Sequence, residues 1–152
     1  MNKVYLAGPI SGQSYDDVVA VINKKKSYLE NLGYTVLNPM TAKKAIRTEI
    51  KLRSSGYGNP ESTNHAIFER DRWMVENTDI IFVDFSSAEE RVSIGSCMEM
   101  AWGSILGKYI VAVIPKGSVH EHAFVLEAAD IVYETTEEAL NYLEQFALQD
   151  CE

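Results

Sequence analysis

Apolar residues follow two different spacings along the chain, and segments with the two spacings alternate. Short runs rich in β-branched and aromatic residues predict strands, whereas apolar residues three or four positions apart predict helices. Predicted strands lie at residues 3–7, 34–39, 78–85, 108–115 and 130–133. Predicted helices lie at residues 16–33, 65–77, 94–107, 121–129 and 135–148.

This alternation predicts the fold class. Strands that are apolar throughout are typical of a parallel sheet that helices cover on both faces. We therefore expect an α/β protein with a doubly wound, roughly five-stranded parallel sheet, Rossmann-like or flavodoxin-like, in a single domain over residues 1–152. In that architecture ligands bind at the carboxyl ends of the strands. The polar, glycine-containing segment 41–64 interrupts the pattern, and we expect it to hold a short helix and a mobile loop.

Single residues predict several helix ends. Gly33 and Gly107 are expected to close the helices that precede them. Ser93 is expected to cap the helix that begins at residue 94 through its hydroxyl, with Gly95 just inside the first turn. The last helix is expected to begin at Thr135 or Thr136, with acidic residues in its first turn.

Composition and charge narrow the classes of partner. The chain has 14 basic and 22 acidic residues and a net charge of -8, which argues against a broad nucleic-acid interface and favours a small ligand or a locally bound anion. No segment approaches the roughly 20 apolar residues of a membrane span, and the N-terminus lacks a secretory apolar run. We expect a cytoplasmic protein with no membrane partner. Cys97 and Cys151 lack metal-ligand spacing, so we expect ordinary thiols and no metal site.

The loop after the first predicted strand contains Gly8, Ser11 and Gly12. It lacks the GxGxxG and GK[ST] patterns, so a dinucleotide or triphosphate fingerprint is absent. The glycines permit close approach of the backbone, the serine can donate its hydroxyl, and the next helix has a positive N-terminus. The loop can therefore bind a small anion, although a tight turn without a ligand explains these residues equally well.

Glu99 is an acid in an otherwise small and apolar stretch, residues 93–103. An unpaired buried carboxylate is costly, so this side chain needs hydrogen-bond partners or a chemical task. Helical side chains lean toward the N-terminus of their helix, which brings Glu99 closer to Ser93 than the rise of about 9 Å between them suggests. One nucleoside monophosphate can therefore reach Glu99, Ser93 and Gly95 together, with its phosphate at the helix N-terminus.

Other candidate side chains have simpler explanations. Asp71 lies among charged residues on the predicted helix 65–77, where a surface charge paired with arginine is the ordinary explanation. Tyr5 and Leu6 are expected on opposite faces of the sheet, and most such tyrosines are core residues with a hydrogen-bonded hydroxyl. The histidines have no ligand spacing and are taken first as loop residues and second as contacts of a base: His65, His120 and His122.

Three segments in this order resemble the nucleoside 2-deoxyribosyltransferase superfamily. The opening strand and loop of the superfamily resemble KVYLAGPISG. Its aspartate-bearing helix and the strand after it resemble IFERDRWMVENTDIIFVDF. Its GxxxE helix and the next strand resemble SIGSCMEMAWGSILGKYIVAVIP. The resemblance implies that Glu99 is the nucleophile that attacks the anomeric carbon, Asp71 an acid that assists at the base or sugar, and Tyr5 a hydrogen-bond partner of Glu99. It also implies no cofactor, and a homodimer or higher homo-oligomer with the Glu99 helix near the interface.

The residue six positions before Glu99 separates two branches of the superfamily. Transferases that act on free nucleosides usually carry aspartate there, whereas the 5'-monophosphate N-hydrolases, CMP hydrolases included, carry serine, as this chain does at Ser93. An aspartate would repel a phosphate dianion. The final residues, ALQDCE, also lack the aromatic tail of those transferases. The hydrolases often have an arginine where this chain has Ser11, and four cations are candidates to replace it: Lys43, Lys44, Arg47 and Arg53.

We therefore expect an N-glycosidase that hydrolyses a (deoxy)nucleoside 5'-monophosphate to free base and (deoxy)ribose 5-phosphate. A 2-deoxyribosyltransferase that passes the sugar to a second base is the nearest alternative, because it forms the same glycosyl-enzyme. Two alternatives come from other classes. One is a nucleotide-binding module without catalysis, in which Glu99 orients the ribose, and the other is a receiver-type interaction domain with Asp71 and Asp84 as surface acids.

Overall fold

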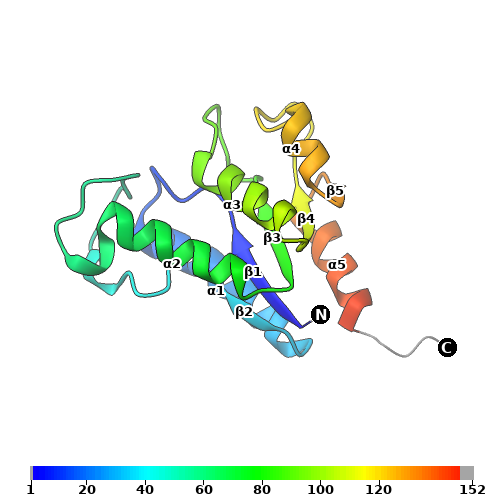
Figure 1. Cartoon of the computed structure of the whole chain (residues 1–152), viewed down its shortest axis with the longest axis horizontal. Coiled ribbons are helices and arrows are strands. Elements are labelled where there is room, and N and C mark those ends of the chain that lie inside the picture. Colours follow the sequence, from blue (N-terminus) through cyan, green and yellow to red (C-terminus); the bar gives the residue numbers. More distant parts are fainter. Residues whose placement is uncertain (1, 148–152) are drawn as a thin grey trace.

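The computed structural model describes residues 2–147, which form a five-stranded sheet flanked by helices (Figure 1). The spatial order of the strands is β2-β1-β3-β4-β5, and all four pairings are parallel. This order is that of flavodoxin-like proteins, so the predicted doubly wound α/β fold is confirmed. The strands are β1 (Lys3–Ala7), β2 (Thr35–Leu37), β3 (Ile80–Asp84), β4 (Tyr109–Val113) and β5 (Ile131–Tyr133).

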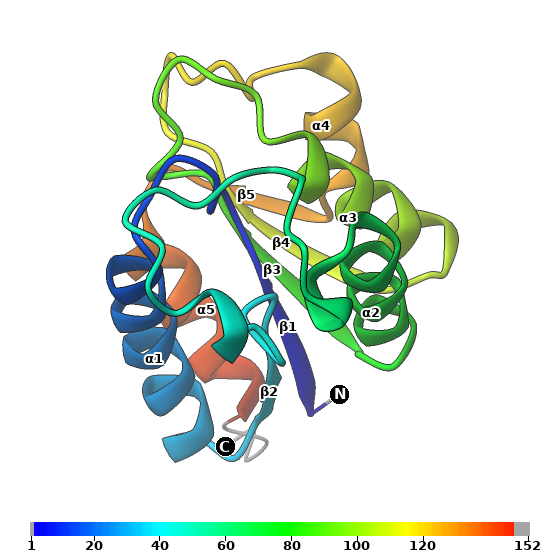
Figure 2. The ribbon, with the colours of Figure 1, turned by 90° about the vertical axis from the view of Figure 1, so that its left-hand side faces the viewer.

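Helices cover both faces of the sheet. Helices α1 and α5 lie on one face, and α2, α3 and α4 lie on the other (Figure 2). None of the helices within residues 2–147 combines the length and the apolar composition needed to cross a bilayer. The helices are α1 (Tyr15–Asn31), α2 (Asn64–Glu76), α3 (Ile94–Ile105), α4 (Ala123–Ala128) and α5 (Thr136–Ala147), with 3₁₀ turns η1 (Lys44–Ile46) and η2 (Pro60–Ser62).

The alternation of side chains along β1 divides the core into two halves. Leu6 faces α1 and α5, where it packs in one cluster with Leu29 and Leu143. Tyr5 points to the other face and packs with Met74 of α2 in a second cluster, as predicted from strand geometry. Leu29 and Leu143 are fully buried, and each such side chain stabilises the fold by about 1.5–3 kcal/mol.

Most of the predicted helix ends are confirmed, but the cap of α3 is not. Gly33 and Gly107 follow α1 and α3 with positive φ angles of 95° and 69°, a backbone conformation that favours glycine. Thr135 accepts a hydrogen bond through Oγ1 from a backbone N–H in the first turn of α5. The prediction that Ser93 caps α3 is wrong, because its hydroxyl accepts no backbone hydrogen bond and instead donates to Ser96 Oγ at 2.8 Å.

The segment 41–64 arches over the carboxyl end of β1 (Figure 2). Its helical content is two 3₁₀ turns, η1 and η2, in place of the expected short helix. Two backbone hydrogen bonds of 2.7 Å fasten it to the first loop, one from Gly12 N–H to the Leu52 carbonyl and one from Leu52 N–H to the Gln13 carbonyl. Leu52 and Tyr57 of this segment are buried in a small apolar cluster that also contains Val18 of α1. The segment is therefore a packed cover over this edge of the sheet.

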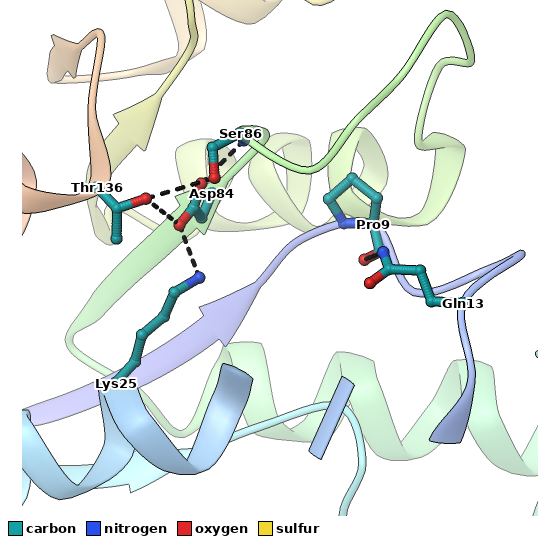
Figure 3. Close-up of polar contacts among 6 residues, drawn as sticks. All are labelled: Pro9, Gln13, Lys25, Asp84, Ser86 and Thr136. Atoms are coloured by element: carbon teal, nitrogen blue, oxygen red, sulfur yellow. Dashed lines mark hydrogen bonds and ion pairs between the residues drawn. The ribbon is translucent and has the colours of Figure 1, made fainter. Parts of the chain in front are cut away.

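Asp84, at the end of β3, ties three elements together (Figure 3). Its carboxylate pairs with Lys25 Nζ of α1 at 2.6 Å and accepts hydrogen bonds from the Thr136 hydroxyl and the Ser86 N–H. Burial opposes ionisation of Asp84, but Lys25 and the two hydrogen bonds together hold its pKa below the usual value. Asp84 is thus a buried, fully partnered group, and its assignment as a surface acid of a receiver-type domain is wrong.

Candidate active site

A cleft of about 590 Å³ opens at the carboxyl ends of β1 and β3. The chain leaves β1 through α1 toward β2 and leaves β3 through α3 toward β4, so the two connections diverge at this point of the sheet. Doubly wound proteins bind ligands at such a switch point, because the loops part and leave a crevice. The walls are the first loop, the segment 41–64, α2, the loop after β3 and the N-terminal turn of α3.

Segments far apart in the sequence bring the predicted site residues to this cleft. Asp71 comes from α2, Glu99 from α3 and the phosphate-binding candidates from the two loops and the start of α3. Tyr5 does not line the cleft, because it is fully buried in β1 beneath it. The predicted residues that do line the cleft are Gly8, Ser11, Gly12, Asp71, Ser93, Gly95 and Glu99.

Two buried carboxyl groups line the cleft, and each has one oxygen without a hydrogen-bond partner among residues 2–147. Glu99 and Asp71 are 7% and 8% exposed, and neither Glu99 Oε2 nor Asp71 Oδ1 has a partner. Burial raises the pKa of Glu99 well above its ordinary value, and the negative charge of Asp71 adds to this effect. Burial likewise raises the pKa of Asp71 to about 6, against the opposing charges of Lys43 and Arg70. Perturbed acids that share a cleft are typical of catalytic sites.

The explanation of Asp71 as a surface charge paired with arginine is wrong. Arg72 instead pairs with Glu69 on the outside of α2, at 2.7 Å. Arg70 donates a hydrogen bond to the Glu61 carbonyl at 2.9 Å. Asp71 itself is buried and lines the cleft.

Tyr5 lies beneath Glu99. Its hydroxyl is buried and makes no hydrogen bond of regular geometry, but it lies close enough to Glu99 to favour the ionised carboxylate. Burial raises the pKa of Tyr5 well above its usual value, and the negative charge of Glu99 raises it further. Tyr5 is therefore a neutral phenol whose hydroxyl can donate a hydrogen bond to the Glu99 carboxylate.

Four cations line the same cleft: Lys43, Lys51, Arg53 and Arg91. Of the predicted replacements for the missing arginine, Lys43 and Arg53 reach the cleft, whereas Lys44 and Arg47 do not line it. Lys43 is 3% exposed, and burial lowers its pKa although Asp71 favours its charged form. Arg53 stacks on the Tyr57 ring with its guanidinium carbon 4.5 Å from the centroid.

Lys51 is a site residue that sequence reasoning missed. Its Cε lies 4.0 Å from the point where a side chain at Gly12 would begin, so the lysine extends over the first loop. The backbone hydrogen bonds of Leu52 hold it there. Gly12 has a φ of +87°, and Gly8 lies so close to the Asp84 carbonyl that an added Cβ would be 2.7 Å from the oxygen. Both positions of the loop therefore favour glycine.

The N-terminus of α3 opens into the cleft with unused donors. Within residues 2–147 no acceptor is found for the Gly95 and Ser96 backbone N–H groups, since the Ser93 hydroxyl is engaged with Ser96 Oγ. The positive end of the helix dipole adds to the attraction of an anion at this point. Because the Ser93 hydroxyl does not cap α3, the N–H groups of Gly95 and Ser96 stay available as hydrogen-bond donors to an anion.

The three histidines have different surroundings, and none lines the cleft. His120 is 1% exposed and accepts a hydrogen bond from the Ser93 N–H, which makes it a buried structural partner of the α3 terminus. His122 caps α4 by accepting from the Phe124 N–H, and His65 lies on α2. The expectation that they contact a base has no support in these positions.

Among the described residues, no three His, Cys, Asp or Glu side chains gather to hold a metal ion. Cys151 lies outside the described residues, and Cys97 is a free, half-buried thiol.

Comparisons with known proteins place this arrangement in context. Residues 4–143 match the family model of nucleoside 2-deoxyribosyltransferases. No curated protein sequence matches the chain. Two solved structures are similar over nearly their whole length. The CMP N-glycosidase BcmB of Clostridium botulinum has a TM-score of 0.58 and 17% identity, over 95% of this chain and 99% of that one. A conserved protein of Enterococcus faecalis V583 has a TM-score of 0.61 and 15% identity, over 96% and 99%. At these identities the likeness concerns the fold.

Proposed function

The chain belongs to the nucleoside 2-deoxyribosyltransferase family, and from this premise we propose that it hydrolyses the N-glycosidic bond of a (deoxy)nucleoside 5'-monophosphate. The products are the free base and (deoxy)ribose 5-phosphate. The family match supports chemistry at the anomeric carbon of a nucleoside. The residues of the cleft support the narrower choice of a phosphorylated substrate. The similar protein of Clostridium botulinum is named for the same class of reaction.

The observation that carries the proposal is the pair of unpartnered carboxyl oxygens, Glu99 Oε2 and Asp71 Oδ1, in one cleft. Buried polar groups without partners are rare because each lost hydrogen bond is costly. Two such atoms at one ligand-sized cleft are explained if substrate supplies the missing partners. A non-catalytic module would need only hydrogen bonds to the ribose, and it gives no reason for two acids with raised pKa values.

Glu99 and Asp71 take complementary parts in the first step. Glu99 attacks C1' of the sugar as the ionised carboxylate, the form that the Tyr5 hydroxyl and the charge of Lys43 favour against burial, and it forms an ester bond as the C1'–N bond to the base breaks. The electrons of that bond go to the base nitrogen, and the Asp71 carboxylic acid gives the base its proton. With its pKa raised to about 6, Asp71 holds that proton much closer to neutral pH than an ordinary aspartate does.

Water completes the reaction in the second step. A water molecule attacks C1', the ester bond to Glu99 breaks, and the Asp71 carboxylate takes the proton from the water. Two displacements at the same carbon retain its configuration. The Tyr5 hydroxyl, close beneath Glu99, stabilises the carboxylate when it leaves. The buried surroundings strengthen the attraction between this carboxylate and the cationic sugar of the transition state.

The 5'-phosphate is assigned to the N-terminal turn of α3 and the first loop. Ser93 carries no negative charge, and the free N–H groups of Gly95 and Ser96 supply donors there. Lys51 belongs to the segment 41–64 and extends over Gly12, and it supplies the cation that the first loop lacks. A phosphate at this point lies toward the N-terminus of the helix that carries Glu99, which leaves the sugar between phosphate and nucleophile.

The test is a product analysis on a panel of ribo- and deoxyribonucleoside monophosphates and the matching nucleosides. Free base and sugar 5-phosphate from monophosphates are the expected products, and Glu99→Gln should lower kcat by at least about 10³-fold while the protein stays folded. Retained activity in that variant would remove Glu99 from the role of nucleophile. Ser93→Asp should raise KM for monophosphates far more than for nucleosides, and an equal effect on both would contradict the phosphate assignment.

A second candidate is base exchange on free nucleosides, which the name of the family favours. Both reactions share the Glu99 ester and differ only in whether water or a second base attacks C1'. Addition of an acceptor base distinguishes them, because transfer produces a new nucleoside and hydrolysis does not. If ligands bind but stay intact in every mixture, the protein is a binding module and both catalytic proposals fail.

A further inference from the structure

We propose that His120 is a positioning residue that holds the phosphate-binding end of α3 in place by accepting the Ser93 backbone N–H. The inference deepens the proposed function and rests on it. His120 comes from the loop after β4 and does not line the cleft, so it acts through Ser93 and not by contact with substrate.

The imidazole of His120 is fixed from three sides. Nε2 accepts the Ser93 N–H at 2.9 Å, and the ring stacks on Phe85 with the centroids 3.9 Å apart and the planes 15° from parallel. Ser118 Oγ lies 3.5 Å from Nδ1 and also accepts the His120 backbone N–H at 3.1 Å. With 1% of the residue exposed, the side chain has little room to move.

The hydrogen bond from Ser93 defines the protonation state of His120. An imidazole nitrogen that accepts a hydrogen bond carries no proton, so Nε2 is bare and the single proton lies on Nδ1, toward Ser118. The ring stacks on Phe85 and has Ser93 and Ser118 as polar partners, and none of these three residues is charged. Burial also lowers the pKa of His120, which agrees with the neutral form.

The need for such a support follows from the loop between β3 and α3. Residues 86–92 are mostly exposed, and this loop ends at Ser93, next to the free N–H groups of Gly95 and Ser96. The Ser93 hydroxyl does not cap the helix, so His120 supplies the anchoring contact at this end of the loop. Loss of the acceptor should let the first turn of α3 shift against the rest of the cleft. Glu99 lies further along α3, in its buried face, and should be disturbed less.

The experiment compares two substitutions at one position with a control at a neighbour. His120→Phe keeps a flat ring on Phe85 but removes the acceptor, whereas His120→Gln retains an oxygen acceptor at a similar reach. We expect His120→Phe to raise KM for a nucleoside monophosphate at least about fivefold and to lower kcat by less, and His120→Gln to restore most of the affinity. His122→Phe is the matched control, because His122 is exposed and its side chain bonds and packs against Phe124 of α4. The KM of this variant should match that of the natural protein.

Failure of the His120 inference and failure of the proposed function give different results. An unchanged KM in His120→Phe, or an equal rise in both His120 variants, would overturn the positioning role while wild-type turnover still supports the hydrolase. Absence of turnover in the wild type would refute the proposed function itself. A measurement that needs no variant is amide hydrogen exchange: the Ser93 amide proton should exchange more slowly than those of Gly95 and Ser96. Equal exchange of the three protons would also overturn the inference.

Discussion

Asp71→Asn should make the protein more stable at neutral pH while it removes activity. The carboxylate of Asp71 is buried, its Oδ1 has no hydrogen-bond partner within residues 2–147, and the charges of Lys43 and Arg70 do not offset the loss of hydration. Asparagine has nearly the same shape and carries no charge to desolvate. The change in the free energy of unfolding in Asp71→Asn therefore measures how much the buried acid destabilises the fold.

The size of the gain follows from the pKa. A carboxyl group whose pKa rises from 3.8 to about 6 on folding binds its proton more tightly in the folded state. The contribution of Asp71 to the free energy of unfolding is therefore fully present at low pH, and it is lost as the pH rises from about 3.8 to about 6. At about 1.4 kcal/mol per pKa unit, ionised Asp71 reduces the free energy of unfolding by about 3 kcal/mol at pH 8 and by about half of that at pH 5.

The assay is urea unfolding of the natural protein and Asp71→Asn at several pH values between about 5 and 8. The difference in the free energy of unfolding should grow with pH by about 1.5 kcal/mol across this range and then level off. Asp79→Asn is the control of opposite sign, because backbone N–H groups of Lys3 and Asn2 hydrogen-bond to Asp79 and lower its pKa. A gain that does not depend on pH, or a loss of stability at pH 8, would refute the reasoning about Asp71.

Three further predictions concern rate, substrate affinity and packing. If Asp71 donates the proton, kcat/KM should fall as pH rises above about 6, and a flat profile would contradict its role as the acid. Lys51→Gln should raise KM for monophosphates about fivefold or more, whereas Lys26→Gln should leave it unchanged, because Lys26 pairs with Glu30 on α1 and does not line the cleft. Gly8→Ala should lower the free energy of unfolding by about 1–3 kcal/mol because its Cβ meets a carbonyl, and Gly58→Ala, with open space around it, serves as the control in thermal unfolding.

The order of strands and helices could be predicted because it depends on local patterns. Strands β3 and β4 are buried on both faces, so their sequences contain almost no polar residue and read directly as central strands. Gly33 and Gly107 mark helix ends because the left-handed backbone there suits glycine. Strand β2 is shorter than predicted, three residues in place of six, because pairing with β1 ends at Leu37.

The environment of the site residues could not be predicted, because it depends on contacts between distant segments. Within its own helix Asp71 has the pattern of a surface charge, and its burial depends on the segments that pack around α2, among them α3. Lys51 reaches the cleft because Leu52 pairs with the first loop, about forty positions earlier in the chain. His120 reads as a loop residue until Phe85 and Ser93 are seen on either side of it. The resemblance to a family assigned roles to Glu99 and Asp71, and these roles stay predictions.

The charge of the whole protein and the charge of its proposed substrate have the same sign, so the cleft must overcome a general repulsion. A net charge of -8 disfavours the approach of a phosphate dianion, and two acids at the bottom of the cleft add to this at short range. The opposing groups are local: four cations on the cleft walls and the uncapped N-terminus of α3. The α3 N-terminus and Lys51, which extends over Gly12, are positive where the phosphate is assigned, and the unpartnered carboxyl oxygens lie where the sugar is assigned. A ligand with its negative charge at one end and a sugar that becomes cationic in the middle matches this division, whereas a uniformly charged anion does not.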